Sequence, residues 1–456
     1  MTVCRNFEEY PLQECRVAIV DPVNMRLLVV SDDLESRLPR ISIPISSRMA
    51  ATATEAIYDT FSVSTIQLVN IADDDSQTRL LVHELVAARP RSTDSVTLAH
   101  IAIENLVPGQ LSETEGGLLN RLISGETTEF GRFARVGWID DLFRSMGYGT
   151  DRSEWPEIRH LNQGINFSLL SVTQYDKPTR WFKAVGVPNT HEYFITMELR
   201  RRVPAMLPKI LQAIPEWHAW WSEGVIPGTR LDQSCDVDDW IRTLGCLAAL
   251  QKQLAPSTAS FRDAGAETWT CLRLLSLLEP FFADATKASL AQTTKRARRL
   301  EQHDLDELRA SIESGLSAVA SSGLPDTVNH GDIGHGNILI GQKGSVFLDW
   351  AGCYIGPPFF TSEHLIADFD RCYPGRLQEV NLLRRTYLNG WQSHIAPRLF
   401  RTTVTLAPGL AAFAYGVMVW HGSLQRRDPT QAWPIIRSML RRTVREFGPV
   451  REVVVP

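Results

Sequence analysis

Apolar and polar positions follow two periodicities along this chain, and the change from one to the other divides it. Two short β-rich runs, Arg16–Val20 and Arg26–Val30, are separated by an Asp-Pro-Val-Asn turn signal, which predicts a hairpin. The Ala-rich segment Met49–Phe61 has apolar residues at helical spacing, and strands are expected again at Ile66–Ile71 and Leu80–Leu85. Strands around one early helix predict a compact α+β module at the start of the chain.

A second group of short β-rich runs follows a polar, Gly-rich stretch at Gly147–Asp151, which is typical of a boundary. The group predicts a small sheet accompanied by one helix. In chain order, we expect strands at Glu157–Leu161, Phe167–Val172 and Arg180–Val185, a helix at about His191–Arg202, and a strand at Trp217–Trp221.

Beyond Pro227 the apolar residues recur at helical spacing over long stretches, so this part is expected to be mainly helical. One strand-like island, Asn329–Trp350, interrupts the helices. The helices are expected at Trp240–Gln253, Trp269–Phe282, Asp304–Ser321, Leu377–Trp391, Pro408–Trp420 and Ala432–Phe447.

These patterns divide the chain into four expected parts. Residues 1–110 form the α+β module, and residues 111–154 form a helical linker. Residues 155–226 form a small, sheet-rich lobe, and residues 227–456 form a large helical lobe with a hairpin at 329–350. The expected fold class is α+β, with the first module separate from the two lobes.

Charge and composition narrow the choice of partners and compartment. The 456 residues carry a formal net charge of −5, from Lys+Arg 47 and Asp+Glu 52, whereas a nucleic-acid partner requires a basic face. No apolar run approaches the roughly 18 residues that suggest a membrane span. The acidic start of the chain has no apolar core, so it is no signal peptide. We expect a soluble, cytoplasmic protein with no nucleic-acid or membrane partner.

The cysteines give no sign of a disulfide framework or a structural zinc site. The chain has seven of them, widely scattered and without a CxxC pair. Reduced, mostly buried thiols are the expected state.

The island at Asn329–Trp350 carries the residues with the clearest chemistry. Two apolar runs surround a Gly-Gln-Lys-Gly turn, which predicts a hairpin. The hairpin presents Asp332, Asn337 five residues later, and Asp349 at the end of the second run. Phosphoryl transfer needs such a set, because one carboxylate orients the attacking hydroxyl while an amide and a second carboxylate hold Mg²⁺ against nucleotide phosphates. Hard oxygen ligands suit Mg²⁺, so no Cys/His metal site is implied.

The motif H-G-D-x-x-x-x-N, which starts at His330 and is followed by D-W, resembles the aminoglycoside phosphotransferase family of small-molecule kinases. The protein-kinase pattern H-R-D-x-x-x-x-N then D-F-G is related to it. The resemblance implies a bilobal, protein-kinase-like fold and transfer of the γ-phosphoryl group of ATP, or GTP, to a hydroxyl. It implies Asp332 as the catalytic base, Asn337 and Asp349 as Mg²⁺ ligands, and His330 as a support of the loop. His335 is expected to be a loop residue without a chemical role.

The resemblance also implies an ion pair upstream of the hairpin. A phosphate-pairing lysine is expected on the third strand of the small lobe, where Lys183 alternates with apolar neighbours. Only seven of the 47 basic residues are lysine, and the planar fork of arginine is a poor substitute for a point charge. The glutamate partner is expected on the next helix, where Glu192 fits best and Glu198 is the alternative.

The expected nucleotide contacts are less specific. The loop after the first strand of the small lobe contains a single glycine, Gly164, so phosphate binding is expected from backbone amides together with Asn162, Asn166 or Ser168. A plain hairpin turn is the alternative explanation of this loop. The interlobe hinge is expected to follow the strand at Trp217–Trp221, which assigns the adenine contact to Ser222 and Gly224.

The acceptor is expected to be a small molecule. After Asp349 the chain enters a tight Gly/Pro turn and then a helix, without the long activation segment of a protein kinase. Aminoglycosides, sugars, amino alcohols and natural-product hydroxyls all stay open. Carboxylates for a cationic acceptor are offered by the segment Leu231–Asp239 and by Glu363, Asp368 and Asp370, and a solvated acidic face is the alternative reading of them.

Within the first module, residues 15–90 faintly resemble a Nudix domain, in which a hairpin precedes a helix and further strands. Here the helix offers Glu55 and Asp59 but no Glu-Glu pair, so a hydrolase site is expected to be lost. The alternative is an unrelated α+β domain that serves as a cap, a gate or a homodimer contact. An active small-molecule kinase is the main hypothesis for the whole chain. A catalytically silent nucleotide-binding module is the next, followed by a protein kinase and a pyrophosphatase in the first module.

Overall fold

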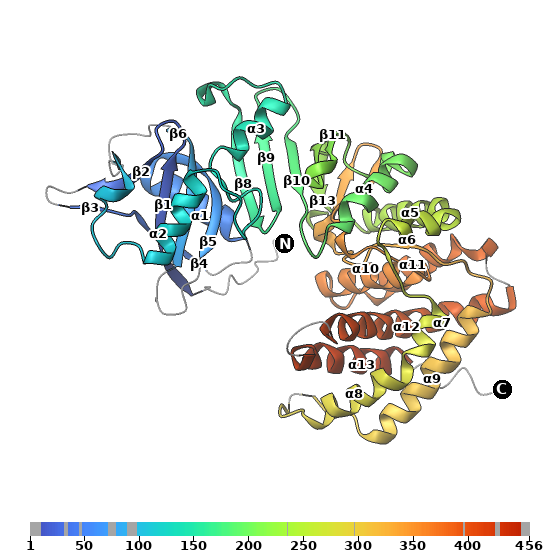
Figure 1. Ribbon diagram of the computed structural model, residues 1–456. Coiled ribbons are helices and arrows are strands. Elements are labelled where there is room, and N and C mark those ends of the chain that lie inside the picture. The colour runs from blue at the N-terminus through green and yellow to red at the C-terminus, as the bar shows by residue number, and fades with distance from the viewer. Residues whose placement is uncertain are drawn as a thin grey trace. The chain divides into compact units, whose positions relative to one another are not determined.

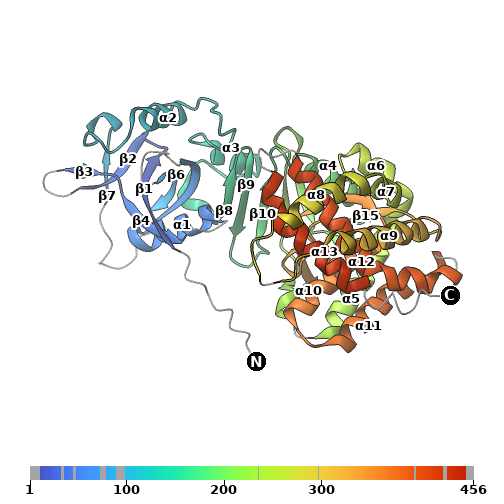
Figure 2. The same ribbon diagram turned by 90° about the horizontal axis from the view of Figure 1, so that it is seen from below.

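The computed structural model describes residues 11–31, 35–44, 48–71, 79–88, 98–234, 236–295, 297–394, 397–424 and 429–447 (Figures 1 and 2). Contacts group the chain into two compact units. Unit 1 contains residues 1–190 and 210–224, and unit 2 contains residues 191–209 and 225–456. This grouping differs from the predicted four parts, because it joins the first module, the expected linker and the strands of the small lobe.

Unit 1 begins with a seven-stranded sheet in the order β3-β2-β1-β6-β5, in which β4 also pairs with β1 and β7 with β2. The predicted first hairpin is confirmed by the antiparallel pairing of Ile19 with Leu28. The pairing of β1 with β6 is parallel, with Val17 opposite Leu81. The strands are β1 (Leu12–Asp21), β2 (Arg26–Ser31), β3 (Ser36–Arg37), β4 (Arg40–Pro44), β5 (Val63–Ile71), β6 (Arg79–Ala88) and β7 (Leu98–Ile101).

Helix α1 (Met49–Phe61) has the predicted bounds. Ala50, Ala53 and Ile57 are buried at helical spacing, which directs one face of the helix into the core of this sheet. The helix ends at Ser62, whose left-handed backbone (φ 57°) lets its N–H bond the carbonyl of Tyr58.

A second sheet of unit 1 has five antiparallel strands in the order β11-β12-β10-β9-β8. The three strands predicted before residue 190 are confirmed, and the strand predicted at Trp217–Trp221 begins and ends two residues later. The strand β11, in the segment after the predicted helix, was not expected. The bounds are β8 (Glu157–Gly164), β9 (Phe167–Thr173), β10 (Arg180–Ala184), β11 (Ile210–Ile214) and β12 (Ala219–Glu223).

Residues 111–154, expected to be a linker, supply helices α2 (Glu113–Ile123) and α3 (Trp138–Ser145) to a large apolar core. Leu119 of α2 and Phe143 of α3 are fully buried there, together with residues of both sheets. Ser112 caps α2 by accepting the N–H of Glu115, whose carboxylate accepts the N–H of Ser112 in return. The two sheets of unit 1 are therefore joined by continuous packing.

Unit 2 is mainly helical, as predicted, and carries two three-stranded sheets, β13-β16-β17 and β14-β18-β15. Its helices are α4 (His191–Arg202), α5 (Val237–Leu254), α6 (Thr258–Asp263), α7 (Cys271–Ser276), α8 (Leu278–Leu290), α9 (Gln302–Ala320), α10 (Phe359–Cys372), α11 (Leu377–Asn389), α12 (Pro397–Leu424) and α13 (Trp433–Phe447). Its strands are β13 (Pro227–Arg230), β14 (Glu267–Thr268), β15 (Thr327–Asn329), β16 (Ile338–Gly341), β17 (Gly344–Phe347) and β18 (Tyr354–Gly356).

The helix predicted at Trp269–Phe282 is two helices in the structure. The Thr270 side chain caps α7 by accepting the N–H of Arg273, and α8 begins at Leu278 after a break. Trp269 precedes both helices, and its N–H donates to the carbonyl of Ile355 at 2.6 Å. Apolar periodicity runs through the break and does not reveal it.

Among the described residues, one helical stretch is long and apolar enough to cross a membrane, Thr402–Leu424 of α12. Its mean hydropathy is 1.5, and 67% of it is buried inside the structure. Ala407, Leu410 and Val417 belong to the main core of unit 2. Burial of this kind is typical of the central helix of a helical domain.

Candidate active site

The predicted catalytic hairpin is present in unit 2. Strands β16 and β17 pair with Ile338 opposite Phe347 and Gly341 opposite Gly344, which leaves Gln342 and Lys343 as a two-residue turn. Gly344 has φ 124°, a value that favours glycine. Ile338 and Phe347 are fully buried, so the hairpin is anchored in the helical core and holds the segments at its open end.

Asp332 and Asn337 lie in direct contact before the hairpin. The Asn337 Nδ2 donates to the backbone oxygen of Asp332 at 2.9 Å and to its Oδ2 at 3.2 Å. The Asn337 backbone is held on both sides, because its N–H donates to Gly334 and its carbonyl accepts from Leu348. Its Oδ1 is the amide atom that stays available to a cation, while the exposed Asp332 is accessible to an acceptor.

Asp349 follows β17 and has a left-handed backbone, with φ 62° and ψ 73°. Few residues other than glycine adopt this conformation, and such positions cluster at functional sites. His330 fixes the neighbouring chain, since its Nε2 hydrogen-bonds the Leu348 carbonyl at 2.6 Å and its ring lies 4.6 Å from that of Trp350. This contact ties the Asp332 segment to the Asp349 segment.

Close backbone approach reinforces that tie. A Cβ built at Gly331 would lie 1.9 Å from the backbone oxygen of Gly352, so only glycine fits between His330 and Asp332. The three oxygen-bearing side chains of the motif are therefore presented by two chain segments held in contact.

A fully buried polar network supports the residue before the motif. The Asn329 Oδ1 accepts from Gln251 Nε2 at 3.0 Å and from Thr361 Oγ1 at 2.8 Å, and its Nδ2 donates to the carbonyls of Thr327 and Gly356. The Thr361 Oγ1 also accepts the N–H of His330 at 3.2 Å. Tyr387 on α11 donates its hydroxyl to Gln251 Oε1. A satisfied buried network of this kind fixes its members strongly.

The polar network and its partners are residues that sequence patterns did not identify. Gln251 on α5, Thr361 on α10 and Tyr387 on α11 lie far apart in the sequence and belong to no motif. Buried polar residues at otherwise apolar helix positions were the available signal, but that signal does not say which residues they contact.

His335 has contacts to other elements that the sequence did not reveal. Its backbone N–H and its Nδ1 both bond the Oδ2 of Asp368 on α10, at 2.8 and 2.6 Å. Its Nε2 lies 3.4 Å from an oxygen of Asp232, and its Nδ1 lies 3.5 Å from the Cys372 sulfur. The loop between Asp332 and Asn337 is thus attached to α10.

Two of the carboxylates expected to face solvent or a cationic acceptor, Glu363 and Asp368, are buried. Glu363 is 1% exposed and receives both Nε and Nη2 of Arg384, at 2.8 and 2.9 Å. Asp368 is 5% exposed and binds His335 and Arg371. The expectation of a solvated face is wrong for both residues. Both oxygens of Glu363 are already bound by Arg384.

Lys183 and the two candidate glutamates lie in different units. Lys183 is half-buried on β10 between buried Phe182 and Ala184, and its Nζ lies 5.9 Å from the centre of the Trp220 ring. Glu192, in unit 2, is 2% exposed in the first turn of α4. Burial raises the pKa of Glu198, but hydrogen bonds from Arg201 and Arg202 outweigh that effect and hold the pKa below its ordinary value.

Hydrogen bonds along its own helix set Glu198 apart from Glu192. Glu198 Oε2 accepts from Arg201 at 2.7 Å and from Arg202 at 3.0 Å, both on its own helix. Glu198 is therefore engaged along α4, which favours Glu192 as the functional carboxylate.

The loop expected to cover phosphates is a tight hairpin between β8 and β9. Gly164 pairs with Phe167, and Asn162 Oδ1 accepts the N–H of Gln163. At the turn, Asn166 has φ 54° and its Oδ1 accepts the N–H of Arg132 at 3.0 Å. Ser222 belongs to β12 instead of following the strand, and beyond it the Gly224 N–H donates to the Thr179 carbonyl at 2.7 Å.

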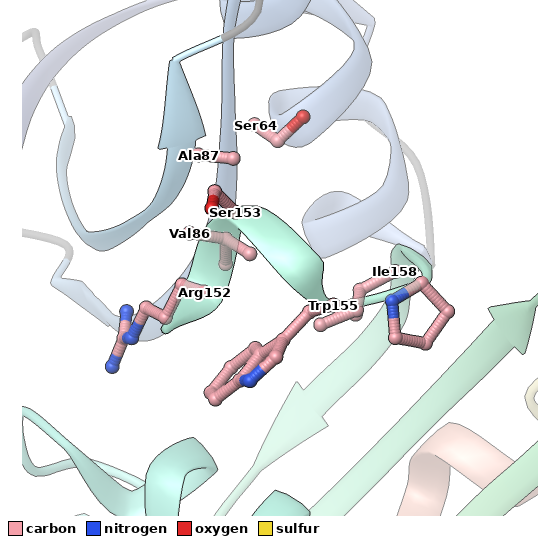
Figure 3. A pocket seen from close by; sticks show the side chains of 8 residues that line it. Ser64, Val86, Ala87, Arg152, Ser153, Trp155 and Ile158 are labelled. Atoms are coloured by element: carbon pink, nitrogen blue, oxygen red, sulfur yellow. The ribbon is translucent and has the colours of Figure 1, made fainter. Parts of the chain in front are cut away.

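Two small cavities lie among the described residues of unit 1. One of about 200 Å³ is lined by Val86, Arg152, Trp155 and Ile158 among others (Figure 3). The other, of about 290 Å³, is lined by Glu55 and Asp59 of α1 together with residues of β5 and β8. Glu55 pairs with Arg159 at 2.8 Å. The Nudix resemblance stays a prediction.

Comparison with known families identifies the part of the chain that carries the hairpin. Residues 202–385 match the "Phosphotransferase enzyme family" (APH). This match confirms the resemblance to the aminoglycoside phosphotransferase family that the motif indicated. The matched segment is less than half of the chain and includes Asp332, Asn337 and Asp349, and the match identifies this segment as part of a small-molecule phosphotransferase. No curated protein sequence matches the chain.

Solved structures to which the chain is similar include a choline/ethanolamine kinase family protein, an ethanolamine kinase and a macrolide 2′-phosphotransferase. A choline/ethanolamine kinase family protein from Mesorhizobium loti is 14% identical, with a TM-score of 0.42, over 68% of this chain and 94% of the other. A Plasmodium vivax ethanolamine kinase is 11% identical, with a TM-score of 0.45, over 69% and 87%. A macrolide 2′-phosphotransferase from Brachybacterium faecium is 17% identical, with a TM-score of 0.39, over 64% and 96%.

Proposed function

We propose that this protein transfers the γ-phosphoryl group of ATP or GTP to the hydroxyl of a small molecule. The single observation that carries the proposal is the Asp332–Asn337 contact within the family-matched segment. It places an exposed carboxylate next to an amide oxygen, which are the groups that phosphoryl transfer requires for the acceptor and for the metal.

Asp332 has the role of orienting the acceptor hydroxyl and accepting its proton. The carboxylate is exposed, and its backbone oxygen and Oδ2 are held by Asn337, which restricts the directions it can take. A positioned base of this kind contributes about 10²-fold or more to turnover. His330 and Gly331 act as supports, because they hold this segment against the chain that carries Asp349.

Asn337 and Asp349 are the residues that would hold Mg²⁺. The donor set fits this ion, since an amide Oδ1 and a carboxylate are hard oxygen ligands, and the Asn337 Nδ2 is turned away toward Asp332. Bound Mg²⁺ neutralises charge that develops on the transferred phosphoryl group.

The proposal extends to nucleotide binding by Lys183, with Glu192 as its helix partner. Lys183 is half-buried among buried strand neighbours, which suits a lysine that binds a phosphate more than one that is merely solvated. Asn162, Gly164, Ser222 and Gly224 are proposed as further nucleotide contacts, through backbone groups in the case of the last two.

The acceptor class is the open part of this proposal. An amino alcohol, an aminoglycoside, a sugar or another natural-product hydroxyl would each supply the reacting oxygen. A panel of such acceptors, with ADP or GDP release as the readout, identifies the class directly.

The assignment of roles is tested by comparing Asp332→Asn with Asp349→Asn. Asp332→Asn is expected to leave Mg-nucleotide affinity nearly unchanged while lowering kcat about 10²-fold or more. Asp349→Asn is expected to weaken Mg-nucleotide binding as well as turnover. Calorimetric titration of Mg-nucleotide into both variants needs no acceptor, and an equal loss of affinity in the two would refute the assignment.

The lysine has a matched control in the same unit. Lys183→Met is expected to raise the KM for the nucleotide. Lys177→Met should leave this KM unchanged, because the Nζ of exposed Lys177 bonds the side chain of Gln174 on its own turn. Equal effects of the two substitutions would contradict a nucleotide role for Lys183.

A further inference from the structure

Three side chains of different chemical types converge beside the loop that joins Asp332 to Asn337. His335 Nδ1, Asp368 Oδ2 and Cys372 Sγ all lie within 4.8 Å of one another. Asp368 and Cys372 are four residues apart on α10, so they project from the same face of that helix. His335 reaches them from the short turn before β16.

The spacing of two of these donors is that of ligands on one metal ion. For Zn–N of about 2.0–2.1 Å and Zn–S of about 2.3 Å, a tetrahedral ion separates nitrogen and sulfur by roughly 3.5 Å. The His335 Nδ1 and the Cys372 Sγ are 3.5 Å apart. Asp368 Oδ2 is 2.6 Å from the same Nδ1 and must withdraw by less than about 1 Å to bind such an ion.

The groups behind the donors have the arrangement that supports metal ligands. The other ring nitrogen of His335, Nε2, lies 3.4 Å from Asp232 Oδ2, and ligating histidines usually donate that N–H to a carboxylate. Arg371 holds the second oxygen of Asp368 at 2.8 Å. The Oδ1 of Asp232 is a buried oxygen with no hydrogen-bond partner among the described residues.

We propose that His335, Asp368 and Cys372 form a binding site for a divalent transition-metal ion of the Zn²⁺ type, with solvent as the fourth ligand. Imidazole and thiolate select such an ion over Mg²⁺, which prefers oxygen. The site is therefore chemically separate from the Asn337 and Asp349 oxygens. An ion bound at Nδ1 requires the neutral ring to carry its proton on Nε2, beside Asp232, and the thiol proton to leave to solvent.

The absence of a sequence signature has a simple cause. His335 lies 33 residues before Asp368, and only the contact of the catalytic loop with α10 brings them together. A search for CxxC or closely spaced histidines therefore passes over the site. The same contact means that an ion here would fasten the loop to α10 more firmly than the present hydrogen bond does.

The site is tested with Co²⁺ as a spectroscopic probe, added to the full chain in excess Mg²⁺. One equivalent is expected to produce a thiolate-to-Co²⁺ absorption band in the near ultraviolet and visible bands of tetrahedral Co²⁺. Cys372→Ser should abolish the thiolate band. Cys246→Ser is the matched control, because Cys246 is also half-buried, and this variant should retain the band. Asp232→Asn should lower the affinity for Zn²⁺, measured by its displacement of Co²⁺, by about 10–100-fold.

A second measurement needs no variant. Zn²⁺ should slow alkylation of Cys372 by iodoacetamide in the unmodified chain, as measured by mass spectrometry of its peptide, while alkylation of Cys246 continues. The proposal is overturned if no thiolate band forms at one equivalent, if the band survives Cys372→Ser, or if Mg²⁺ abolishes it. An unchanged alkylation rate of Cys372 would overturn it equally.

Discussion

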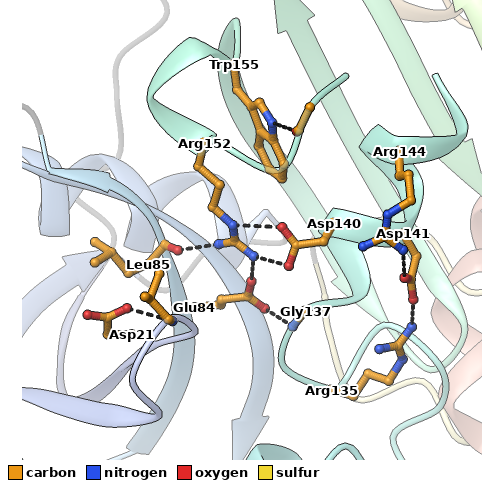
Figure 4. Close-up of polar contacts among 12 residues, drawn as sticks. Asp21, Glu84, Leu85, Arg135, Gly137, Asp140, Asp141, Arg144, Arg152 and Trp155 are labelled. Carbon is orange, nitrogen blue, oxygen red and sulfur yellow. Dashed lines mark hydrogen bonds and ion pairs between the residues drawn. The ribbon is translucent and has the colours of Figure 1, made fainter. Parts of the chain in front are cut away.

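Arg152 is the cation that joins distant segments of unit 1. Its Nη1 donates to the Leu85 carbonyl at 2.6 Å, and its Nε and Nη2 bond both oxygens of Asp140 at 2.9 and 2.6 Å (Figure 4). Its Nη2 also bonds Glu84, a residue of β6 whose side chain is fully buried. Glu84 holds the N–H of Gly137 with its other oxygen. We expect Arg152→Ala to destabilise the unit severely.

The size of the effect follows from what the substitution leaves behind. Removing one partner of a buried ion pair costs about 3–5 kcal/mol, because the other charge stays buried without compensation. Arg144→Ala is the matched control, since the Arg144–Asp141 pair at 3.1 Å has side chains 62% and 39% exposed. Such surface pairs contribute about 1 kcal/mol or less. Urea unfolding followed by tryptophan fluorescence measures both, and equal losses would refute the reasoning.

The pH dependence gives a second, signed test of the same network. Burial raises the pKa of Glu84, and the charge of Arg152 opposes that rise. In Arg152→Ala, the pKa of Glu84 in the folded protein therefore rises further. A carboxyl group whose pKa is higher in the folded protein than in the unfolded chain contributes stability that is fully present below the unfolded pKa. That contribution is lost as the pH rises through the folded pKa. The stability gap between wild type and Arg152→Ala should therefore narrow as pH falls toward 4.5.

The double variant Arg152→Ala/Glu84→Gln isolates the charge as the cause. The neutral amide cannot leave a buried charge unpaired, so the double variant should be more stable at pH 7 than Arg152→Ala alone. A double variant that is no more stable would show that lost packing, and not charge, dominates.

Three further predictions concern the hairpin support and a buried histidine. Tyr387→Phe should lower stability by about 1–3 kcal/mol, because Gln251 loses a buried hydrogen-bond donor, and an unchanged urea midpoint would contradict this. Gly331→Ala should lower kcat by about 10²-fold, because the added methyl group displaces the chain beside Asp332. Gly334→Ala should change kcat little, because a Cβ at Gly334 would lie 3.7 Å from its nearest neighbour, Asp368 Oδ2. Burial lowers the pKa of His160 to about 4, so this residue alone should contribute about 2 kcal/mol to the stability lost from pH 7 to pH 5. His160→Asn should flatten that slope in unfolding experiments at the two pH values.

The local part of the fold could be predicted from the sequence with good precision. Helix α1 and helix α4 have the expected bounds, because each repeats apolar residues at helical spacing between clear ends. The hairpin at 338–347 was predicted from two apolar runs and a glycine-bounded turn. These signals are contained in short windows of sequence.

Contacts between distant segments could not be predicted in the same way. The parallel pairing of β1 with β6 and the burial of α2 and α3 between the sheets depend on tertiary packing, so residues 111–154 were assigned to a linker. For the site, the motif gave the residue types of Asp332, Asn337 and Asp349. It could not give the attachment of His335 to Asp368, since no local pattern records a partner on another helix.

The order of segments in unit 1 has a practical consequence for anyone who wishes to study the parts separately. The chain leaves this unit after Thr190, forms α4 in unit 2, returns at Ile210 and leaves again after Gly224. Truncation at one peptide bond therefore cannot release either unit whole: ending at residue 190 removes strands β11 and β12, and starting at residue 225 removes helix α4. A stand-alone sheet unit would need residues 191–209 replaced by a short linker from β10 to β11, and a stand-alone helical unit would need α4 rejoined at its start.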